Sequence, residues 1–156
     1  MDQELGQVDS FKGDYEKFSN FYPVVIHFDC LNYPSVEHAF VASKSKDGFF
    51  RRQISELPAD KAGKAKRMGK KCKIRQDWDM VKLANMKRFL LQKFVYDEFR
   101  TLLLSTGDMP IIEGNYWHDN YWGDCYCPKC KDIKGKNNLG KLLMKVRRTV
   151  RDWTRY

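Results

Sequence analysis

Long hydrophobic runs are missing from the sequence: no apolar stretch approaches the roughly 20 residues that a membrane-spanning helix needs. The first ten residues, MDQELGQVDS, are polar and acidic, and they lack both the positive start and the apolar core of a secretory signal. These two absences argue against a membrane protein and against export. We therefore expect a cytoplasmic protein that makes no membrane contact.

Cysteine is scarce and odd in number: five residues in a chain without an export signal. Such usage argues against a disulfide framework and favours reduced thiols. Three of the five form a C-x-C-x₂-C pattern at Cys125, Cys127 and Cys130, a spacing that zinc sites use. A second pair at that spacing is missing, so a fourth ligand would have to fold close from His118, Cys72 or Cys30. The sequence favours a loop of reduced thiols without a metal and leaves a zinc site as the alternative.

Acidic residues are absent between Lys61 and Arg75, where eight residues are basic. The whole chain of 156 residues carries a net charge of +9, with 29 Lys and Arg against 20 Asp and Glu. A charge of this sign favours an anionic partner such as nucleic acid or a nucleotide. The basic stretch itself is either a solvated helix face or a surface that contacts phosphates.

Local patterns predict a chain of short strands and helices. Residues 24–28 and 31–33 predict a β-hairpin, because a β-branched run is followed by a turn at Asp29 and Cys30. We expect a short strand and then a structured loop over residues 11–23. Helical periodicity and start signals predict helices over residues 33–46, 47–55, 58–71, 77–94, 96–105 and 138–150. Residues 1–10 are expected to be a polar lead-in, and residues 11–156 a single domain.

The rest of the chain is organised around the helix expected at residues 33–46. Pro34 favours a first helical turn, and Asn32 or Ser35 can cap it. Glu37 and Lys44 are seven residues apart, so they share a stripe at the rim of the buried face, roughly 10 Å apart along the axis. A carboxylate and an amine at a core boundary are costly unless they have partners. The pair is either an ordinary boundary or a grip on a bound molecule.

Residues 113–126 have no regular period but combine three acidic residues, two Trp, three Tyr and one His. Loops often carry function because a rigid scaffold positions them. We therefore expect part of a site in this segment. Earlier in the chain, Phe18 with its aromatic neighbours can stack on a planar ring, although a core position is the alternative.

Six motifs in order make the chain resemble the NADAR family, also called the YbiA-like family. They are F-x-G-x-Y-x-x-FSNFYP, YPSVEHAF-x-A-x-K, AK-x-x-G, DWD-x-VK, WGD and N-x-LGK-x-LM-x-VR, and they extend from Phe11 to Val150. The resemblance implies a mainly helical α+β fold with a few short strands, in one compact domain. It also implies an N-glycosidase, since some members remove ADP-ribose from guanine in DNA and others cleave early phosphorylated intermediates of riboflavin synthesis. No cofactor or metal is implied.

The resemblance implies roles for individual residues. The family's catalytic carboxylate corresponds to Glu37 and its lysine to Lys44, while the loop carboxylates correspond to Asp119 and Asp124. Contacts to the substrate correspond to a second set: Ser19, Asn20, Trp78, Tyr121, Trp122 and Asn138. The C-x-C-x₂-C segment after Asp124 departs from the shorter glycine-rich loop of many relatives.

The chemistry of N-glycoside cleavage accounts for these residues. Positive charge develops at C1 of the ribose, and the departing base needs a proton, so a carboxylate set can stabilise the sugar and supply the acid. Lys44 either contacts phosphate or, as a neutral amine, attacks C1 and forms a Schiff base. We expect the ADP-ribose moiety of a modified nucleic acid or a related nucleotide as ligand, with DNA contact through the basic stretch. The alternatives are a riboflavin-pathway substrate and a non-catalytic module that binds ADP-ribose or NAD.

Overall fold

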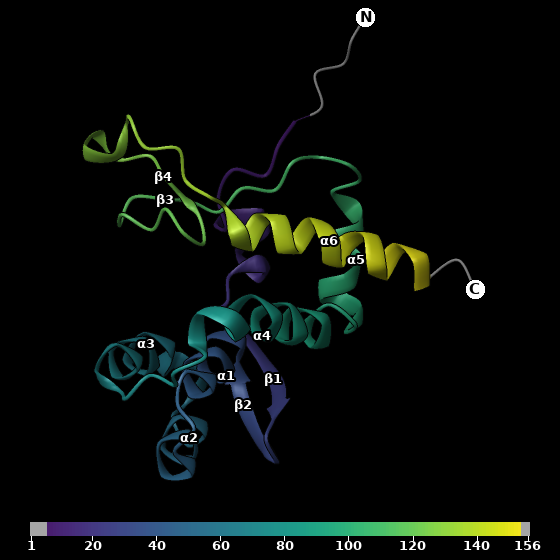
Figure 1. The fold of residues 1–156 in the computed structure, drawn as a ribbon. Helices are drawn as coiled ribbons and strands as arrows, with labels where there is room; N and C mark the ends of the chain where they lie inside the picture. The colour runs from purple at the N-terminus through teal and green to yellow at the C-terminus, as the bar shows by residue number, and fades with distance from the viewer. Residues whose placement is uncertain (1–5, 154–156) are drawn as a thin grey trace, which may run out of the picture. The chain divides into compact units, whose positions relative to one another are not determined.

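A computed structural model describes residues 6–153, and most of its regular structure is helical, as expected (Figure 1). Its elements, where η denotes a 3₁₀ helix, are η1 (Gly13–Phe18), β1 (Pro23–Phe28), β2 (Leu31–Ser35), α1 (Val36–Ser43), α2 (Gly48–Ser55), η2 (Ala59–Lys61), α3 (Ala62–Lys71), α4 (Trp78–Lys93), α5 (Asp97–Ser105), β3 (Gly114–Asn115), β4 (Asp124–Cys125), η3 (Pro128–Cys130) and α6 (Asn138–Trp153). Ser19–Tyr96 form one compact unit, called the central unit here. The described residues before and after it form the other, called the terminal unit.

Two expectations concern the polar lead-in at the N-terminus and helices that span a membrane. The first five residues of the expected lead-in lie outside the described residues. Between residues 6 and 153, no helix has both the length and the apolar character that crossing a bilayer demands.

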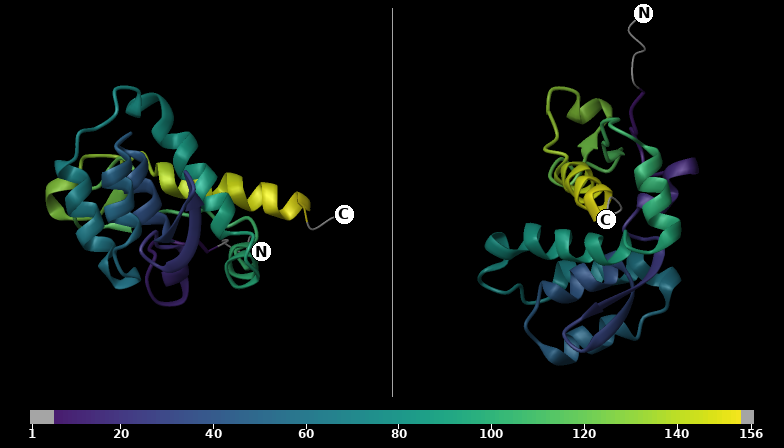
Figure 2. Two further views of the ribbon diagram at one scale, coloured as in Figure 1. Left: turned by 90° about the horizontal axis from the view of Figure 1, so that it is seen from below. Right: turned by 90° about the vertical axis from the view of Figure 1, so that its right-hand side faces the viewer.

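The central unit contains the predicted hairpin. Strands β1 and β2 pair antiparallel, with Ile26 opposite Tyr33 and Phe28 opposite Leu31. Asp29 and Cys30 both have positive φ, 49° and 62°, as a tight two-residue hairpin turn requires. The hairpin packs against α1 and α4, and two further views show the same neighbours (Figure 2).

Helix α1 lies at the core of the central unit, in contact with α2, α3, α4 and both strands of the hairpin. All of its residues except Glu37 are buried, so the single inward face expected from the sequence was too narrow. The reason is that neighbours surround this helix on nearly every side. Only Glu37 in this helix and Lys44 just after it are half-buried, so they form the polar edge of a helix that otherwise lies in the core.

Two expected boundaries were wrong. The helix begins at Val36, and Pro34 belongs to strand β2 instead of a first helical turn. The strand expected within residues 11–23 is the 3₁₀ helix η1, followed by a turn. At the start of α1 the hairpin takes precedence over the local signal, because the pairing of Pro23 with Ser35 fixes the chain before the helix starts.

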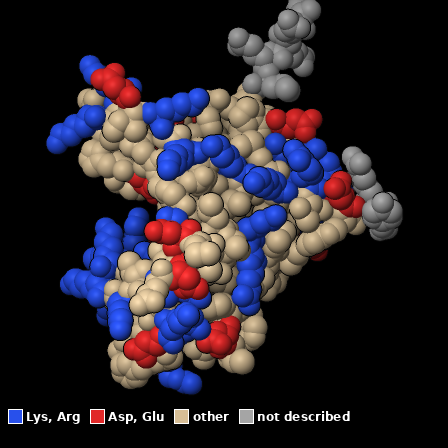
Figure 3. Space-filling view, viewed as in Figure 1, with Lys and Arg blue, Asp and Glu red and all other residues tan. Residues whose placement is uncertain are grey.

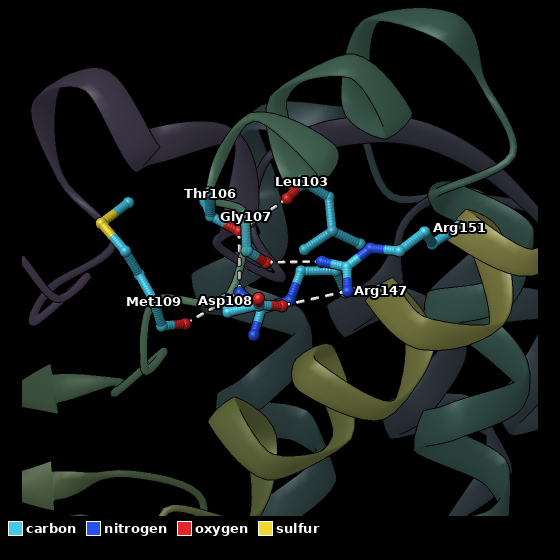
Figure 4. A network of polar contacts seen from close by, with 7 residues as sticks. All are labelled: Leu103, Thr106, Gly107, Asp108, Met109, Arg147 and Arg151. Atoms are coloured by element: carbon cyan, nitrogen blue, oxygen red, sulfur yellow. Dashed lines mark hydrogen bonds and ion pairs between the residues drawn. The ribbon is translucent and has the colours of Figure 1, made fainter. Parts of the chain in front are cut away.

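The terminal unit is organised by α6, which packs on α5. Arg147 donates to Thr106 Oγ1 at 2.9 Å and to the Met109 carbonyl at 2.8 Å, while Arg151 pairs with Asp108 at 3.0 Å (Figure 4). Gly107, at φ 57°, ends the preceding helix. These bonds fasten the end of α5 to α6 and so fix where the following loop starts.

Candidate active site

The start of α1 is fixed by Ser35 and His38. The Ser35 hydroxyl accepts the His38 backbone N–H at 3.1 Å and lies 2.6 Å from His38 Nδ1, while Nε2 lies 3.2 Å from the Pro58 carbonyl. A carbonyl only accepts, so we assign the proton to Nε2 and let the Ser35 hydroxyl donate to Nδ1. Burial lowers the pKa of His38, which agrees with a neutral ring. The histidine next to Glu37 is therefore a structural clamp between α1 and the segment that leads into α3.

The Ser19-Asn20 loop lies on the first turn of α1. The Glu37 N–H donates to the Asn20 carbonyl at 3.0 Å, and Ser19 accepts the backbone N–H groups of Tyr22 at 3.1 Å and Phe21 at 3.2 Å. The structure thus brings the Ser19-Asn20 loop next to Glu37, and the roles of these residues in substrate binding stay predictions. This backbone bond joins the loop to the helix at the position of the predicted catalytic carboxylate.

Two side-chain amides, one in this loop and one on α4, have buried polar atoms without a hydrogen-bond partner among the described residues. Asn20 Nδ2 lies 3.6 Å from Met86 Sδ, but Asn20 Oδ1 is buried and accepts no hydrogen bond within residues 6–153. On α4, Asn85 precedes Met86 in the chain, and its buried Nδ2 has no partner among the same residues. Buried amides are normally satisfied, so these two are available to a ligand. Sequence reasoning missed Asn85, whose only signal was a poor helix former in mid-helix.

Lys93 is a second residue that sequence reasoning missed. It is fully buried, and its ammonium donates to the Ser19 carbonyl at 2.8 Å. Burial lowers the pKa of Lys93 to about 7. The signal was its position four residues after Phe89 on the apolar stripe of α4, where a lysine is rare unless its charge has a partner.

Lys44 follows the last residue of α1, and α3 approaches it closely. A Cβ on Gly69 would lie 3.0 Å from Val41 Cγ1 and 3.6 Å from Lys44 Cδ, so the glycine of the AK-x-x-G motif allows the contact. The Lys44 carbonyl accepts the Arg75 N–H at 2.8 Å. Burial raises the pKa of the Cys72 thiol, and the positive charge of Lys44 opposes that rise. Lys44 therefore lies between helix α1 and the basic stretch.

Trp78 begins α4 and packs against α1, with its ring centroid 5.0 Å from that of Phe40 and the rings tilted by 51°. The chain before it is held by Arg75, whose guanidinium makes two bonds to the Asp77 carboxylate at 2.6 and 2.9 Å. This pairing holds the pKa of Asp77 at about 2. Trp78 is half-buried, so it is both a core contact of α1 and a partly exposed ring.

In the terminal unit, Asp119 and Asp124 organise their own loop. One Asp119 oxygen accepts the N–H groups of Tyr121 at 3.1 Å and Trp122 at 2.9 Å. One Asp124 oxygen accepts the Gly135 N–H at 3.0 Å. Both carboxylates are half-buried, and each has its Oδ1 engaged by backbone. Their catalytic roles stay predictions beside this observed structural role.

The remaining ring residues and Asn138 fall in the same unit. Tyr121 and Trp122 meet edge to face, with centroids 4.9 Å apart. The carbonyl of Tyr121 accepts the Asn138 N–H at 3.2 Å, so the loop covers the first turn of α6. Phe18 is fully buried and contacts Phe11 edge to face at 5.7 Å, which is the core position that the sequence left open.

Three thiols and one imidazole gather where this loop begins and ends. The metal-binding atoms of His118, Cys125, Cys127 and Cys130 all lie within 4.8 Å of one another. Of the three candidates for a fourth partner, the structure brings His118 to the cluster. All five cysteines are free thiols.

The basic stretch begins at the end of η2 and continues through α3 and the segment after it, and Lys and Arg side chains gather over α3 on the face shown in Figure 3. Six of its eight basic residues are exposed: Lys61, Lys64, Arg67, Lys70, Lys71 and Lys73. Beside it, a cavity of about 620 Å³ is lined by basic and aromatic residues that include Lys46, Lys73 and Phe50. None of the predicted site residues lines this cavity.

Comparisons with known proteins find the family that the sequence motifs resemble, along nearly the whole chain. The family model described as NADAR domain matches residues 9–151. The chain is 37% identical over 145 residues to N-glycosidase YbiA of Escherichia coli (strain K12), covering 88% of this chain and 83% of that protein. It is 36% identical over 146 residues to N-glycosidase Npun_R5314 of Nostoc punctiforme, covering 88% and 87%.

A more distant relative and a solved structure complete the comparison. The riboflavin biosynthesis protein VVA0006 of Vibrio vulnificus is 32% identical over 145 residues, which cover 36% of that longer protein. The NMR structure of the E. coli protein YbiA matches with a TM-score of 0.79 and 34% identity, over 98% of this chain and 91% of that one.

Proposed function

The chain belongs to the NADAR domain family and is an N-glycosidase, a hydrolase of N-glycosyl bonds, and from this premise we propose that its substrate is ADP-ribosylated guanine in DNA. The bond broken is the one between C1 of the ribose and the guanine nitrogen. The products are free ADP-ribose and unmodified DNA.

One observation carries the choice of DNA: the helix that bears Glu37 packs directly against the helix that bears the basic stretch. Gly69 lets the two helices approach at Lys44, and the Lys44 carbonyl holds the backbone of Arg75. A phosphate chain bound along α3 would therefore lie beside the predicted catalytic helix. Lys and Arg supply affinity for a phosphate backbone without reading its sequence, which suits an enzyme that recognises a modification.

The central unit also supplies the groups that the reaction needs. We assign Glu37 to stabilising positive charge at C1 or protonating the departing base, either of which a half-buried carboxylate can do. Lys44 either holds a phosphate or attacks C1 with its neutral amine. In the second case the C1–N bond to guanine breaks, the base leaves with a proton, and water later hydrolyses the imine. The unused amide atoms of Asn20 and Asn85 are assigned to ribose or base contacts.

A second candidate substrate is a phosphorylated intermediate of riboflavin synthesis. The observation that favours it is that the Vibrio relative is named a riboflavin biosynthesis protein. That substrate is also anionic and requires cleavage of the same type of bond. The positive charge of the protein therefore suits both substrates and favours DNA only in degree. A small phosphate would use Lys44 and leave most of the exposed face of α3 without a role.

The deciding experiment incubates the protein with an oligonucleotide that carries ADP-ribosyl-guanine and follows the oligonucleotide mass. Loss of the ADP-ribose mass at a rate that falls steeply with added salt is expected, since each phosphate contact releases counterions. Turnover of a riboflavin intermediate with an unchanged oligonucleotide would overturn the proposal in favour of the second substrate. Tight ADP-ribose binding without any product would leave a binding module.

A charge-reversal pair tests the basic surface itself. The double variant Lys64→Glu/Lys70→Glu alters two exposed residues of α3. We expect a large rise in KM for the oligonucleotide and a shallower salt dependence. The matched control, Lys145→Glu/Arg148→Glu, alters two exposed basic residues of α6 and changes the net charge equally. Equal losses in both variants would mean that net charge, and not α3, attracts the substrate.

A further inference from the structure

The cysteine cluster of the terminal unit is a second chemical centre that the glycosidase reaction does not use. Cys125, Cys127 and Cys130 are buried, at 3%, 8% and 5% exposure, and together they form a small separate cluster. Three buried free thiols in mutual contact, with an imidazole beside them, are not a usual way to fill a loop. Thiolate and imidazole are instead the ligands of structural zinc.

The distances suit a single ion. His118 Nδ1 lies 3.3 Å from Cys127 Sγ and 3.4 Å from Cys130 Sγ. In a tetrahedral site with Zn–S near 2.3 Å and Zn–N near 2.0 Å, ligand atoms are separated by about 3.5–3.8 Å. The largest separation in the cluster is 4.8 Å, so small side-chain movements close the tetrahedron.

The local backbone is built for the same purpose. Pro128 starts a turn of 3₁₀ helix in which the Cys130 N–H donates to the Cys127 carbonyl at 3.0 Å, and the thiols on either side of this turn both belong to the cluster. The His118 N–H donates to Cys125 Sγ at 3.3 Å, as backbone amides do to metal-bound thiolates. His118 has φ 69°, a left-handed conformation that costs energy in a residue with a side chain. A bound ion would offset that cost.

We propose that His118, Cys125, Cys127 and Cys130 bind one structural Zn²⁺ ion. Three thiolates and one neutral imidazole complete its four-coordinate shell, so no position remains for water or substrate. Binding releases the thiol protons to solvent and leaves the site with one net negative charge. Lysines at Lys129, Lys131 and Lys134 follow closely in the chain and offset that charge.

The proposed ion would clamp the loop that carries the predicted site residues. His118 immediately precedes Asp119, and Cys125 immediately follows Asp124. A bond from each end of this segment to one ion closes it into a ring. The carboxylates and the Tyr121-Trp122 pair would then be held by a metal in place of a packed core.

The first test measures zinc in the reduced full-length protein by mass spectrometry of the metal. We expect one zinc per chain, retained after dialysis and lost with a strong chelator. Cys127→Ser should reduce the zinc content at least tenfold under the same conditions. Cys30→Ser, which alters an exposed thiol in the hairpin turn, is the matched control and should keep one zinc per chain. Equal zinc loss in both variants would mean adventitious thiol binding and overturn the proposal.

The second test reads the ligand set without relying on zinc retention or activity. Cobalt(II) added to the metal-free protein should give thiolate-to-metal charge-transfer bands and the visible bands of a tetrahedral ion, saturating at one equivalent. Cys130→Ser should lower the charge-transfer intensity by about one third, because one of three thiolates is removed. A wild-type titration without these bands, or a disulfide between two of the three cysteines in the protein as isolated, would overturn the proposal. Iron at one equivalent in that protein would overturn the assignment to zinc.

Discussion

Helix α1 of the central unit and the 113–126 loop of the terminal unit both present carboxylates, but different forces hold them. In α1, Glu37 belongs to a helix that is buried on nearly every side and capped by Ser35. In the loop, Asp119 and Asp124 keep their places through hydrogen bonds from backbone N–H groups. Only short pieces of strand accompany them. The Glu37 carboxylate is therefore positioned by the packing of its helix. Asp119 and Asp124 are instead held by the hydrogen bonds that their own side chains accept.

The difference indicates how the α1 helix and the 113–126 loop each respond to destabilising changes. A helix surrounded by core loses its geometry only when the unit unfolds, since its contacts are many and individually small. A loop held by a few hydrogen bonds, and by the proposed ion, can lose order while the unit stays folded. Changes near α1 should affect stability and catalysis, whereas changes in the loop should affect local order first.

The largest expected effect is catalytic and concerns α1. Glu37→Gln removes a charge while keeping the shape of the side chain and leaving the backbone bond to Asn20 in place. We expect turnover to fall about 10²–10⁴-fold, the usual contribution of an acid or base, with binding of ADP-ribose retained. Rates from the oligonucleotide assay and calorimetry of ADP-ribose binding measure the two effects. Glu56→Gln, at an exposed carboxylate after α2, is the control, and wild-type turnover in Glu37→Gln would remove this residue from the mechanism.

The next largest effect is a pH dependence that packing creates at Lys93. The pKa is about 7 in the folded protein and about 10.4 in an unfolded chain. Between these values the unfolded chain binds the extra proton, so this lysine makes stability rise with pH from about 7 to about 10. Lys93→Met removes the dependence, so the stability of wild type relative to the variant should be poorest at pH 6 and improve by pH 9.

Urea unfolding of both proteins at the two pH values measures this. Lys87→Met, at an exposed lysine on the same helix, should show a pH-independent difference. The same result for Lys93→Met would show that burial does not perturb the lysine.

A smaller effect is expected at the cap of α1. Ser35→Ala removes the acceptor of the His38 N–H and the partner of its ring nitrogen. We expect a loss of about 2 kcal/mol in the free energy of unfolding, from the cap and from a buried nitrogen without a partner. Urea denaturation measures it, with Ser55→Ala at the end of α2 as the control. A loss as small as that of the control would show that neighbouring contacts hold α1 without its cap.

The smallest effect separates the structural and catalytic parts of Asp119. Asp119→Ala removes the acceptor of the Tyr121 and Trp122 N–H groups, and their amide exchange should speed up about 5–10-fold, the factor for one net hydrogen bond. Asp119→Asn keeps an acceptor oxygen, so exchange should stay near wild type. Loss of turnover in Asp119→Asn with protected amides would assign the charge to catalysis. Fast exchange in that variant instead would mean that the loop needs the negative charge itself.

Much of the fold was predictable because its signals are local. The hairpin and the helices depend on residues a few positions apart, and the structure confirms them. The place where α1 begins was not predictable, since pairing across the hairpin overrode the helix preference of Pro34. The family resemblance, also read from short motifs, is confirmed by the match over residues 9–151.

The sequence alone determined the family, the class of reaction and the placing of Glu37 on a helix that ends just before Lys44. The tertiary structure decided which distant residues meet. It placed the Lys93 ammonium on the Ser19 carbonyl, the His38 ring between Ser35 and Pro58, and His118 among the three cysteines. Periodicity and capping act over one or two turns of chain, so a sequence reveals them directly. Hydrogen bonds and metal sites between distant residues depend on distances that only the packing of the folded chain sets. The positions of those residues in the sequence do not reveal these distances.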